Sequence, residues 1–321
     1  MVNQTKKVKR TVEYSFVIPV FNEEGNIEAL DSEIKSSISK ISKSYEIIYI
    51  NDGSRDNSFN ELKLLKNVKI INLNRNYGQA TALDAGFKIA EGEYVISLDG
   101  DGQNDPADFK KLIEKLKKEN LDVVTGWRKN RKDSNGFRVL TRIGRFMRKI
   151  IINDQVHDTG CTLRVYRKEA VKSLDLQGEM HRYILALLRW KGFKVGELEV
   201  NHRPRIHGTS AYGYSKAIRG FIDLVYISFI QKYSQRPLHI FGYISVASFF
   251  LGVFSGFLSI YQKIFFNLSL NRSGWFFLSI FFILGAIMFF SFGIVMDLMI
   301  RVYLNTSPYE KRYYIREIIE K

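Results

Sequence analysis

Two aspartates separated by one glycine are the residues of this sequence best suited to chemistry. Asp99 and Asp101 lie in the stretch "YVISLDGDGQNDP" (residues 94–106), directly after an apolar run. On an exposed turn, two such carboxylates can point at one hard cation, and Gln103 can add a neutral oxygen ligand. Oxygen ligands with open positions favour Mg²⁺ or Mn²⁺ that also holds a diphosphate. An isolated D-x-D motif is common by chance, so its position in the fold must decide whether it is a metal site.

The aspartate pair follows the last of four apolar runs that alternate with helical patterns. The runs cover residues 14–22, 45–54, 68–74 and 94–102, and the helical patterns cover residues 26–42, 58–67 and 78–92. Continuous apolar runs that alternate with helices predict an α/β fold with a mostly parallel sheet covered on both faces. Such sheets bind ligands beyond the carboxyl ends of their strands.

Polar clusters follow all four strand-like runs. They read "PVFNEEGN", "NDGSRDNS", "NRNYGQ" and "DGDGQNDP". One such cluster would be an ordinary turn, but four at one edge of a sheet predict a shared ligand site. Within the second cluster, Asp56 or Ser58 could instead cap the following helix.

The composition limits which kinds of partner and which cellular compartment are expected. A net charge of +15 implies anionic partners, and nucleic acid, acidic lipid and phosphorylated substrates all fit. The single cysteine, Cys161, allows no internal disulfide, which suits a reducing compartment. The charged N-terminus lacks the apolar core of a signal peptide, so we expect the first domain in the cytoplasm. The sequence contains no cluster of His and Cys residues, so a zinc site is not expected.

Two apolar spans lie beyond residue 237. His239–Tyr261 and Trp275–Ile300 are each long enough to cross a hydrocarbon core about 30 Å thick. Neither span shows a polar face, which argues against a core helix of a soluble protein. Basic residues flank the pair more densely than they occupy the loop between the spans, which predicts a multi-pass hairpin in the cytoplasmic (inner) membrane with both ends in the cytoplasm. The preceding residues 213–237 predict an in-plane amphipathic helix, with a soluble bundle helix as the alternative.

The four clusters resemble those of family-two glycosyltransferases, which have the nucleotide-sugar-binding fold called GT-A. The similarity spans residues 14–216 and is greatest to polyprenyl-phosphate glycosyltransferases, with the hairpin resembling the bacterial glucosyltransferase-like branch. We therefore expect a cytoplasmic GT-A catalytic domain at residues 1–212, a juxtamembrane helix at 213–237, a hairpin at 238–304 and a cytoplasmic tail at 305–321.

The resemblance implies roles for residues on the donor side. The metal ligands would be Asp99, Asp101 and Gln103. Arg205, in a loop similar to the family's R-x-x-G-x-S motif, would swing over the diphosphate and stabilise the charge of the leaving nucleotide. A basic loop that only contacts anionic headgroups is the alternative. The donor-binding residues would be Pro19, Phe21, Asn22, Glu23, Asp52, Asp99, Gly208 and Ser210.

A basic segment, residues 126–150, predicts the acceptor side. Arginine forks match phosphate oxygens, although a solvated face that attracts anionic lipid would have the same composition. The resemblance implies that Asp158 faces the acceptor as a general base or orients the nucleophile. A phosphate monoester has its second pKa near 6, so full proton removal is not required. The residues implied to bind the acceptor phosphate are Arg128, Arg131, Ser134 and Arg138.

The expected reaction is an inverting transfer of a hexose, by analogy glucose from UDP-glucose, to undecaprenyl phosphate. The expected partners are the nucleotide sugar, polyprenyl phosphate and the bilayer, and a homo-oligomer of the chain is left open. Nucleic acid is not expected, because no aromatic platform accompanies the basic segment. A processive polysaccharide synthase is one alternative, but Ala186 replaces the glutamine of its Q-x-x-R-W signature and two spans are too few for a channel. A non-catalytic nucleotide-binding membrane scaffold is the other.

Overall fold

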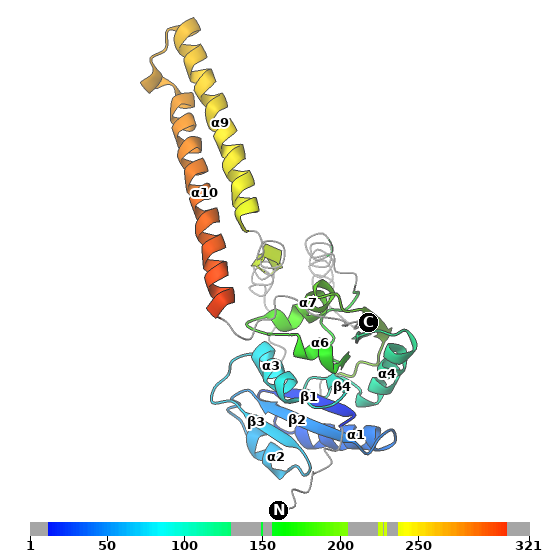
Figure 1. The fold of residues 1–321 in the computed structure, drawn as a ribbon. Coiled ribbons are helices and arrows are strands. Elements are labelled where there is room, and N and C mark those ends of the chain that lie inside the picture. The colour runs from blue at the N-terminus through cyan, green and yellow to red at the C-terminus, as the bar shows by residue number, and fades with distance from the viewer. Residues whose placement is uncertain are drawn as a thin grey trace, which may run out of the picture. The chain divides into compact units, whose positions relative to one another are not determined.

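The computed structural model describes residues 12–129, 156–204 and 237–306, together with residues 149, 224–226 and 228–229 (Figure 1). The chain forms two compact units, Met1–Phe221 and Ile222–Lys321. The predicted boundary at residue 212 lies outside the described residues, as do most of the predicted juxtamembrane helix and the tail from residue 307.

A seven-stranded sheet forms the centre of the first unit, in the order β3-β2-β1-β4-β6-β5-β7. The first four strands along the chain pair in parallel, so their carboxyl ends share one edge. β6 runs antiparallel to β4 and β5, while β7 is parallel to β5. The strands are β1 (Tyr14–Val20), β2 (Tyr45–Asn51), β3 (Lys69–Asn72), β4 (Tyr94–Ser97), β5 (Val123–Trp127), β6 (Arg164–Arg167) and β7 (Val195–Glu199). The predicted mostly parallel sheet is confirmed.

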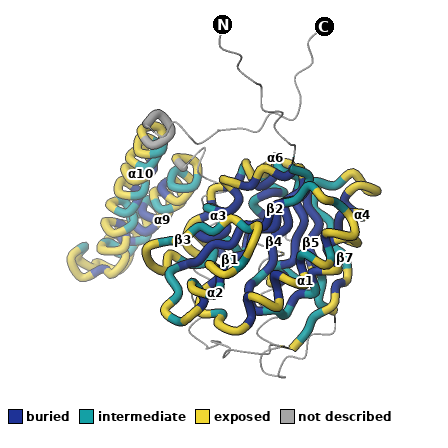
Figure 2. The backbone as a smooth tube through the Cα atoms, turned by 90° about the horizontal axis from the view of Figure 1, so that it is seen from below, coloured by how far each residue is buried: buried dark blue, intermediate teal, exposed yellow. Residues whose placement is uncertain are grey.

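Helices cover both faces of this sheet. On one face, α1 (Ile27–Ser39) and α4 (Phe109–Lys118) pack against Phe16, Ile18 and Tyr49 in the main core cluster. On the other face, α3 (Gln79–Ile89) approaches so closely that a Cβ at Gly86 would lie 2.4 Å from Val17 Cγ1. Successive strand residues therefore contact opposite faces, which explains why the central strands β1, β2 and β4 are largely apolar and buried, whereas β3 and β7 are more exposed (Figure 2).

Short helices complete the first unit. α2 follows β2, α6 follows β6, and α7 precedes β7. Their bounds are α2 (Ser58–Leu64), η1 (Pro106–Asp108), α6 (Lys168–Lys172), η2 (Met180–Tyr183) and α7 (Ile184–Trp190).

The second unit contains two long apolar helices, α9 (Pro237–Phe266) and α10 (Gly274–Thr306), joined through η3 (Leu270–Arg272). Both are long and apolar enough to cross a membrane. Their large side chains face outward, with Phe257 67% and Phe281 69% exposed, a surface that water disfavours and lipid accepts. The Ser245 hydroxyl donates to the Ala286 carbonyl oxygen across the pair at 2.7 Å. The predicted two spans are confirmed as candidate membrane helices; their orientation remains a prediction.

Candidate active site

The loop after β1 is held by side chains of the loop after β2 and of the start of α2. Ser54 Oγ accepts from the Asn22 N–H at 3.1 Å, and Ser58 Oγ accepts from the Glu23 N–H at 2.8 Å. In return, Asn22 Oδ1 accepts from the Arg55 N–H at 2.8 Å. The two loops therefore fix each other before any ligand binds.

The hydrogen bonds that join the loops after β1 and β2 are called the brace below. Three predicted donor residues lie beside it, at the end of β1. Pro19 is in the strand and half-buried, Phe21 is 41% exposed, and Asn22 has the positive φ of 55°. An exposed ring next to a rigid loop at the carboxyl edge suits stacking against a planar ligand. Their contact with a donor remains a prediction.

Asp56 acts within the brace. Its Oδ1 accepts from the Ser58 N–H at 3.0 Å, and its Oδ2 accepts from the Glu24 N–H at 3.1 Å. Burial acts to raise the pKa of Asp56, but the hydrogen bonds from Ser58 and Glu24 outweigh it and hold that pKa below its usual value. The N-cap residue of α2 is Asn57, which makes no side-chain cap hydrogen bond, so Asp56 supports the first N–H of the helix from the position before the cap and is not itself the cap.

Asp52 fixes the loop after β3. Its Oδ1 accepts from the Tyr77 N–H at 2.7 Å and its Oδ2 from the Gly78 N–H at 2.9 Å, and the residue is only 3% exposed. Both carboxylate oxygens thus hold backbone at the start of α3. Gly53, with φ of 66°, permits this approach, since a Cβ there would lie 2.4 Å from the Arg75 carbonyl carbon. A base contact by Asp52 remains a prediction.

Asp99 and Asp101 lie at the end of β4, as predicted. Asp101 is only 5% exposed, so the expectation of an exposed turn was wrong. The cause is a second chain segment, because the Arg203 N–H donates to the Gln103 carbonyl oxygen at 2.9 Å and Asn104 forms a bridge with His202. The Asp101 Oδ1 accepts from the Gln103 N–H at 3.1 Å across the turn.

The aspartate pair fits a hard divalent cation. Burial, and then the negative charge of Asp101, raise the pKa of Asp99, and a bound cation would relieve that repulsion. The donors are carboxylate and carboxamide oxygens, which Mg²⁺ and Mn²⁺ prefer. Within the described residues no group of three or more His, Cys, Asp or Glu side chains could hold a metal alone. A cation held by this pair would complete its coordination with oxygens of a bound ligand.

On the predicted acceptor side, Arg128 and Asp158 form a two-pronged ion pair. Arg128 Nε donates to Asp158 Oδ2 at 2.7 Å and Nη2 donates to Oδ1 at 3.0 Å, with both side chains less than 15% exposed. Burial acts to raise the pKa of Asp158, but Arg128 outweighs it and holds that pKa below its usual value. A carboxylate with occupied oxygens and a lowered pKa is a weak general base.

Six predicted site residues lie outside the described residues, and their roles remain predictions: Arg131, Ser134, Arg138, Arg205, Gly208 and Ser210. The residues just before Arg205 are described. Arg203 donates through Nη1 to Glu33 at 2.8 Å and pairs through Nη2 with Asp105 at 3.1 Å. The segment that leads to Arg205 is thus anchored next to the Asp101 turn.

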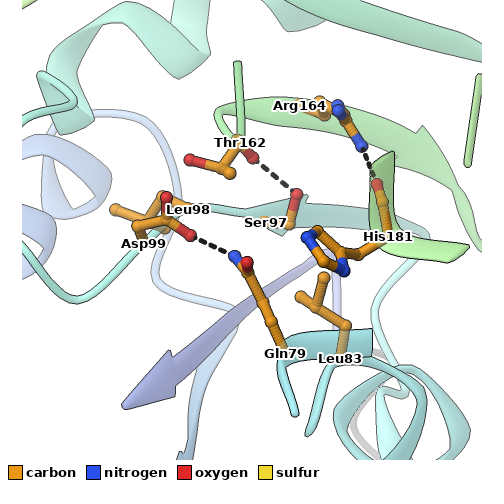
Figure 3. Close-up of a pocket in the computed structure, with 8 residues that line it drawn as sticks. All are labelled: Gln79, Leu83, Ser97, Leu98, Asp99, Thr162, Arg164 and His181. Carbon is orange, nitrogen blue, oxygen red and sulfur yellow. Dashed lines mark hydrogen bonds between the residues drawn. The ribbon is translucent and has the colours of Figure 1, made fainter. Parts of the chain in front are cut away.

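The sequence did not single out a group of side chains beside Asp99. Figure 3 shows Gln79, Thr162, Arg164 and His181 around a small pocket, and Gln79 Nε2 donates to Asp99 Oδ1 at 2.7 Å. One available signal was the basic Arg164 at the start of β6, beside the apolar Val165 and Tyr166. No local signal pointed to Gln79, which reaches Asp99 only because β1 places α3 and β4 side by side.

Comparisons with known proteins agree with this geometry. The sequence model of the family described as "Glycosyl transferase family 2" matches residues 15–175. Dodecaprenyl-phosphate galacturonate synthase of Rhizobium johnstonii is 31% identical, over 99% of this chain and 96% of the relative. Undecaprenyl-phosphate 4-deoxy-4-formamido-L-arabinose transferase of Shewanella sediminis is 32% identical, over 95% and 92%.

A solved structure shows a similar fold. Glucosyl-3-phosphoglycerate synthase from Mycobacterium tuberculosis, crystallised with Mn²⁺, uridine-diphosphate and phosphoglyceric acid, superposes with a TM-score of 0.54 at 17% identity. The match covers 68% of this chain and 78% of that one.

Proposed function

The chain belongs to glycosyl transferase family 2, and on that premise we propose that it transfers one sugar from a nucleotide sugar to polyprenyl phosphate. The predicted family and enzyme class are confirmed by the relatives. The observation that carries the proposal is the Asp99/Asp101 pair at the carboxyl edge of β4, next to the braced loops after β1, β2 and β3.

In the proposed reaction, an oxygen of the lipid phosphate attacks the anomeric carbon of the sugar. The bond from that carbon to the diphosphate breaks, its electron pair leaves with the nucleoside diphosphate, and the anomeric configuration inverts. A divalent cation, Mg²⁺ or Mn²⁺, would neutralise the leaving diphosphate. Asp99, Asp101 and Gln103 would hold it, and Arg205 would add positive charge.

Arg128 and Asp158 would act together on the acceptor. The pair holds the Arg128 guanidinium in one orientation, and that guanidinium would face the incoming phosphate. Since the lipid phosphate is already largely dianionic at neutral pH, Asp158 would orient Arg128 and need not remove a proton.

The membrane hairpin supports a lipid acceptor. Two apolar helices on the catalytic chain would keep it at the bilayer, where polyprenyl phosphate is held. We propose that the catalytic unit and the C-terminus face the cytoplasm. UDP as carrier remains a proposal, and glucose gains no support from the relatives, whose names contain galacturonate and 4-deoxy-4-formamido-L-arabinose.

The test is transfer by the full chain in detergent or membranes, with radiolabelled nucleotide sugars supplied one at a time, polyprenyl phosphate, and Mg²⁺, Mn²⁺ or EDTA. We expect one labelled sugar per lipid phosphate, and loss of transfer with EDTA. A polymeric product would indicate the polysaccharide synthase, and nucleotide binding without transfer would indicate the scaffold. Either result would refute the proposal.

A further inference from the structure

The carboxylate of Asp99 is oriented by side chains from two distant parts of the chain. Gln79 Nε2 donates to Asp99 Oδ1 at 2.7 Å (Figure 3), and the Thr162 side chain also forms a hydrogen bond with Asp99. Thr162 is fixed in turn, because Asn104 Nδ2 donates to its Oγ1 at 2.9 Å. A carboxylate has about four lone-pair positions, so these bonds set its direction and leave positions for a cation.

Gln79 starts from a fixed point in the fold. It is the first residue of α3, and the N–H of the preceding Gly78 donates to Asp52 Oδ2 at 2.9 Å. Further along α3, a Cβ at Gly86 would lie only 2.4 Å from Val17 Cγ1, so the helix is packed tightly against β1. The helix therefore cannot shift against the sheet without losing these contacts. The hydrogen bond from Gln79 is formed before a ligand binds.

The two carboxylates of the predicted metal site are oriented in different ways. Asp101 is oriented within its own turn, since its Oδ1 accepts from the Gln103 N–H at 3.1 Å. Asp99 depends on donors from outside the turn, and Gln79 is a neutral one. A neutral amide fixes the carboxylate without cancelling the negative charge that attracts a divalent cation, whereas a lysine or arginine there would oppose the cation.

On the basis of the proposed function and its metal site, we propose that Gln79 is a positioning residue that orients Asp99 to bind the divalent cation. Gln79 acts through the carboxylate and does not itself contact the metal, the sugar or the nucleotide. Side chains that hold a metal ligand in this way commonly change metal affinity by about 10- to 100-fold. Gln79 thus links the start of α3, which Asp52 anchors, to the metal-binding turn after β4.

The test removes this hydrogen bond and measures binding as well as transfer. Q79M keeps the length of the side chain and a good helix former but has no donor. UDP binding to the full chain in detergent is measured by calorimetry, at several Mn²⁺ concentrations and in EDTA. We expect the Mn²⁺ concentration for half-maximal UDP binding to rise by about 30-fold, and UDP binding in EDTA to change by less than about 2-fold. The Mn²⁺ requirement of sugar transfer should rise with it.

Two further variants control for the substitution and for folding. Q177M makes the same change at an exposed glutamine between α6 and η2, and should leave the Mn²⁺ dependence unchanged. If Q79M fails to fold, Q79N takes its place, because its amide is one methylene too short to keep the same bond. A merely structural role would lower the midpoint of thermal unfolding and leave the Mn²⁺ dependence as it is.

A double variant shows whether Gln79 acts through Asp99. In a D99N chain the carboxylate that Gln79 orients is gone. Adding Q79M to D99N should therefore change the Mn²⁺ dependence of UDP binding by less than about 3-fold.

Four results would overturn the inference. They are an unchanged Mn²⁺ dependence in Q79M or Q79N, an equal loss of UDP binding with Mn²⁺ and with EDTA, the full loss again in the D99N chain, and UDP binding by the unaltered chain that Mn²⁺ does not strengthen. The second would make Gln79 a nucleotide contact. In each case, sugar transfer by the unaltered chain would keep the proposed function, whereas no transfer from any nucleotide sugar would refute the proposed function.

Discussion

The loops after β1 and β2 and the region around β5 and β6 place polar groups in opposite ways. In the loops, every backbone N–H from Asn22 to Gly25 donates to a side chain of the other loop or of α2. Around β5 and β6, the charged groups Arg128, Asp158 and Arg164 are nearly buried, and Arg164 still has an unpartnered Nε. The loops form a frame that is complete without ligand, while the charged region keeps capacity for one.

The Asp99/Asp101 turn lies between these two regions, and the largest expected effect is there. D101N removes one carboxylate of the predicted metal site while keeping its size. We expect kcat to fall by about 1,000-fold and the Mn²⁺ concentration needed for half-maximal transfer to rise. The measurement is steady-state transfer at several Mn²⁺ concentrations.

The control for D101N is E119Q, an exposed carboxylate at the end of α4 that pairs with Lys115. It should retain full activity, and the midpoint of thermal unfolding should be similar in the two variants. Unchanged transfer by D101N in purified membranes would disprove the metal role.

The charged region itself is tested by breaking the ion pair between Arg128 and Asp158. R128Q and D158N each leave one charge buried without its partner, so each should lower the free energy of unfolding by about 4 kcal/mol. The double variant should lose less than the sum, because neither charge remains. Additive losses in denaturant unfolding would show that the pair is not the stabilising unit.

The same pair bears on the pH dependence of transfer. The lowered pKa of Asp158 keeps it ionised well below neutrality, so it does not titrate in the working range. The acid limb of kcat/KM should therefore lie near pH 6, the second pKa of the lipid phosphate. D158N should keep that limb at a lower rate. If D158N loses it, Asp158 is the general base.

In the loops after β2 and β3, close backbone packing adds to the carboxylate hydrogen bonds, and Gly53 is the position at which we test it. In G53A the new Cβ would lie 2.4 Å from the Arg75 carbonyl carbon and 2.6 Å from the Asn76 nitrogen. We expect a loss of about 3 kcal/mol from strain at positive φ and from displacement of that loop, with a raised KM for the donor.

Gly192 is a matched control, because it also has a positive φ, of 87°, but nothing lies within 4 Å of a Cβ there. G192A should therefore cost only the strain, about 1 kcal/mol, without changing KM. Equal losses in the two variants, measured by thermal unfolding, would show that the contact with Arg75 and Asn76 does not matter.

The difference between the two regions also explains what the sequence could predict. Asp99 and Asp101 were predictable because they follow an apolar strand, and the parallel order of β1 to β4 then fixes the shared edge. That argument needs only local patterns and the rule that parallel strands end together.

Contacts across the chain were not predictable in this way. Asp101 is buried because residues 201–204 lie beside its turn, about 100 positions later in the sequence. Arg128 meets Asp158 only because β5 and β6 are paired. The resemblance assigned these two residues separately, Arg128 to the acceptor phosphate and Asp158 to proton removal or to orienting the nucleophile, because nothing local shows that a cation and an anion will neutralise each other.

The smallest expected effect tests whether the frame depends on single hydrogen bonds. Asp56 accepts from the Ser58 and Glu24 N–H groups, so D56A should lower the free energy of unfolding by about 1 kcal/mol and D56N by less, because asparagine keeps one acceptor. Since the pKa of Asp56 is lowered in the folded chain, its contribution is complete above about pH 4 and is lost as the pH falls through the folded value. The difference between the unaltered chain and D56A should therefore shrink in acid, whereas E114A, an exposed carboxylate on α4, should show no such trend. A difference that stays constant down to pH 2 would mean that the ionised carboxylate is not what holds the two loops together.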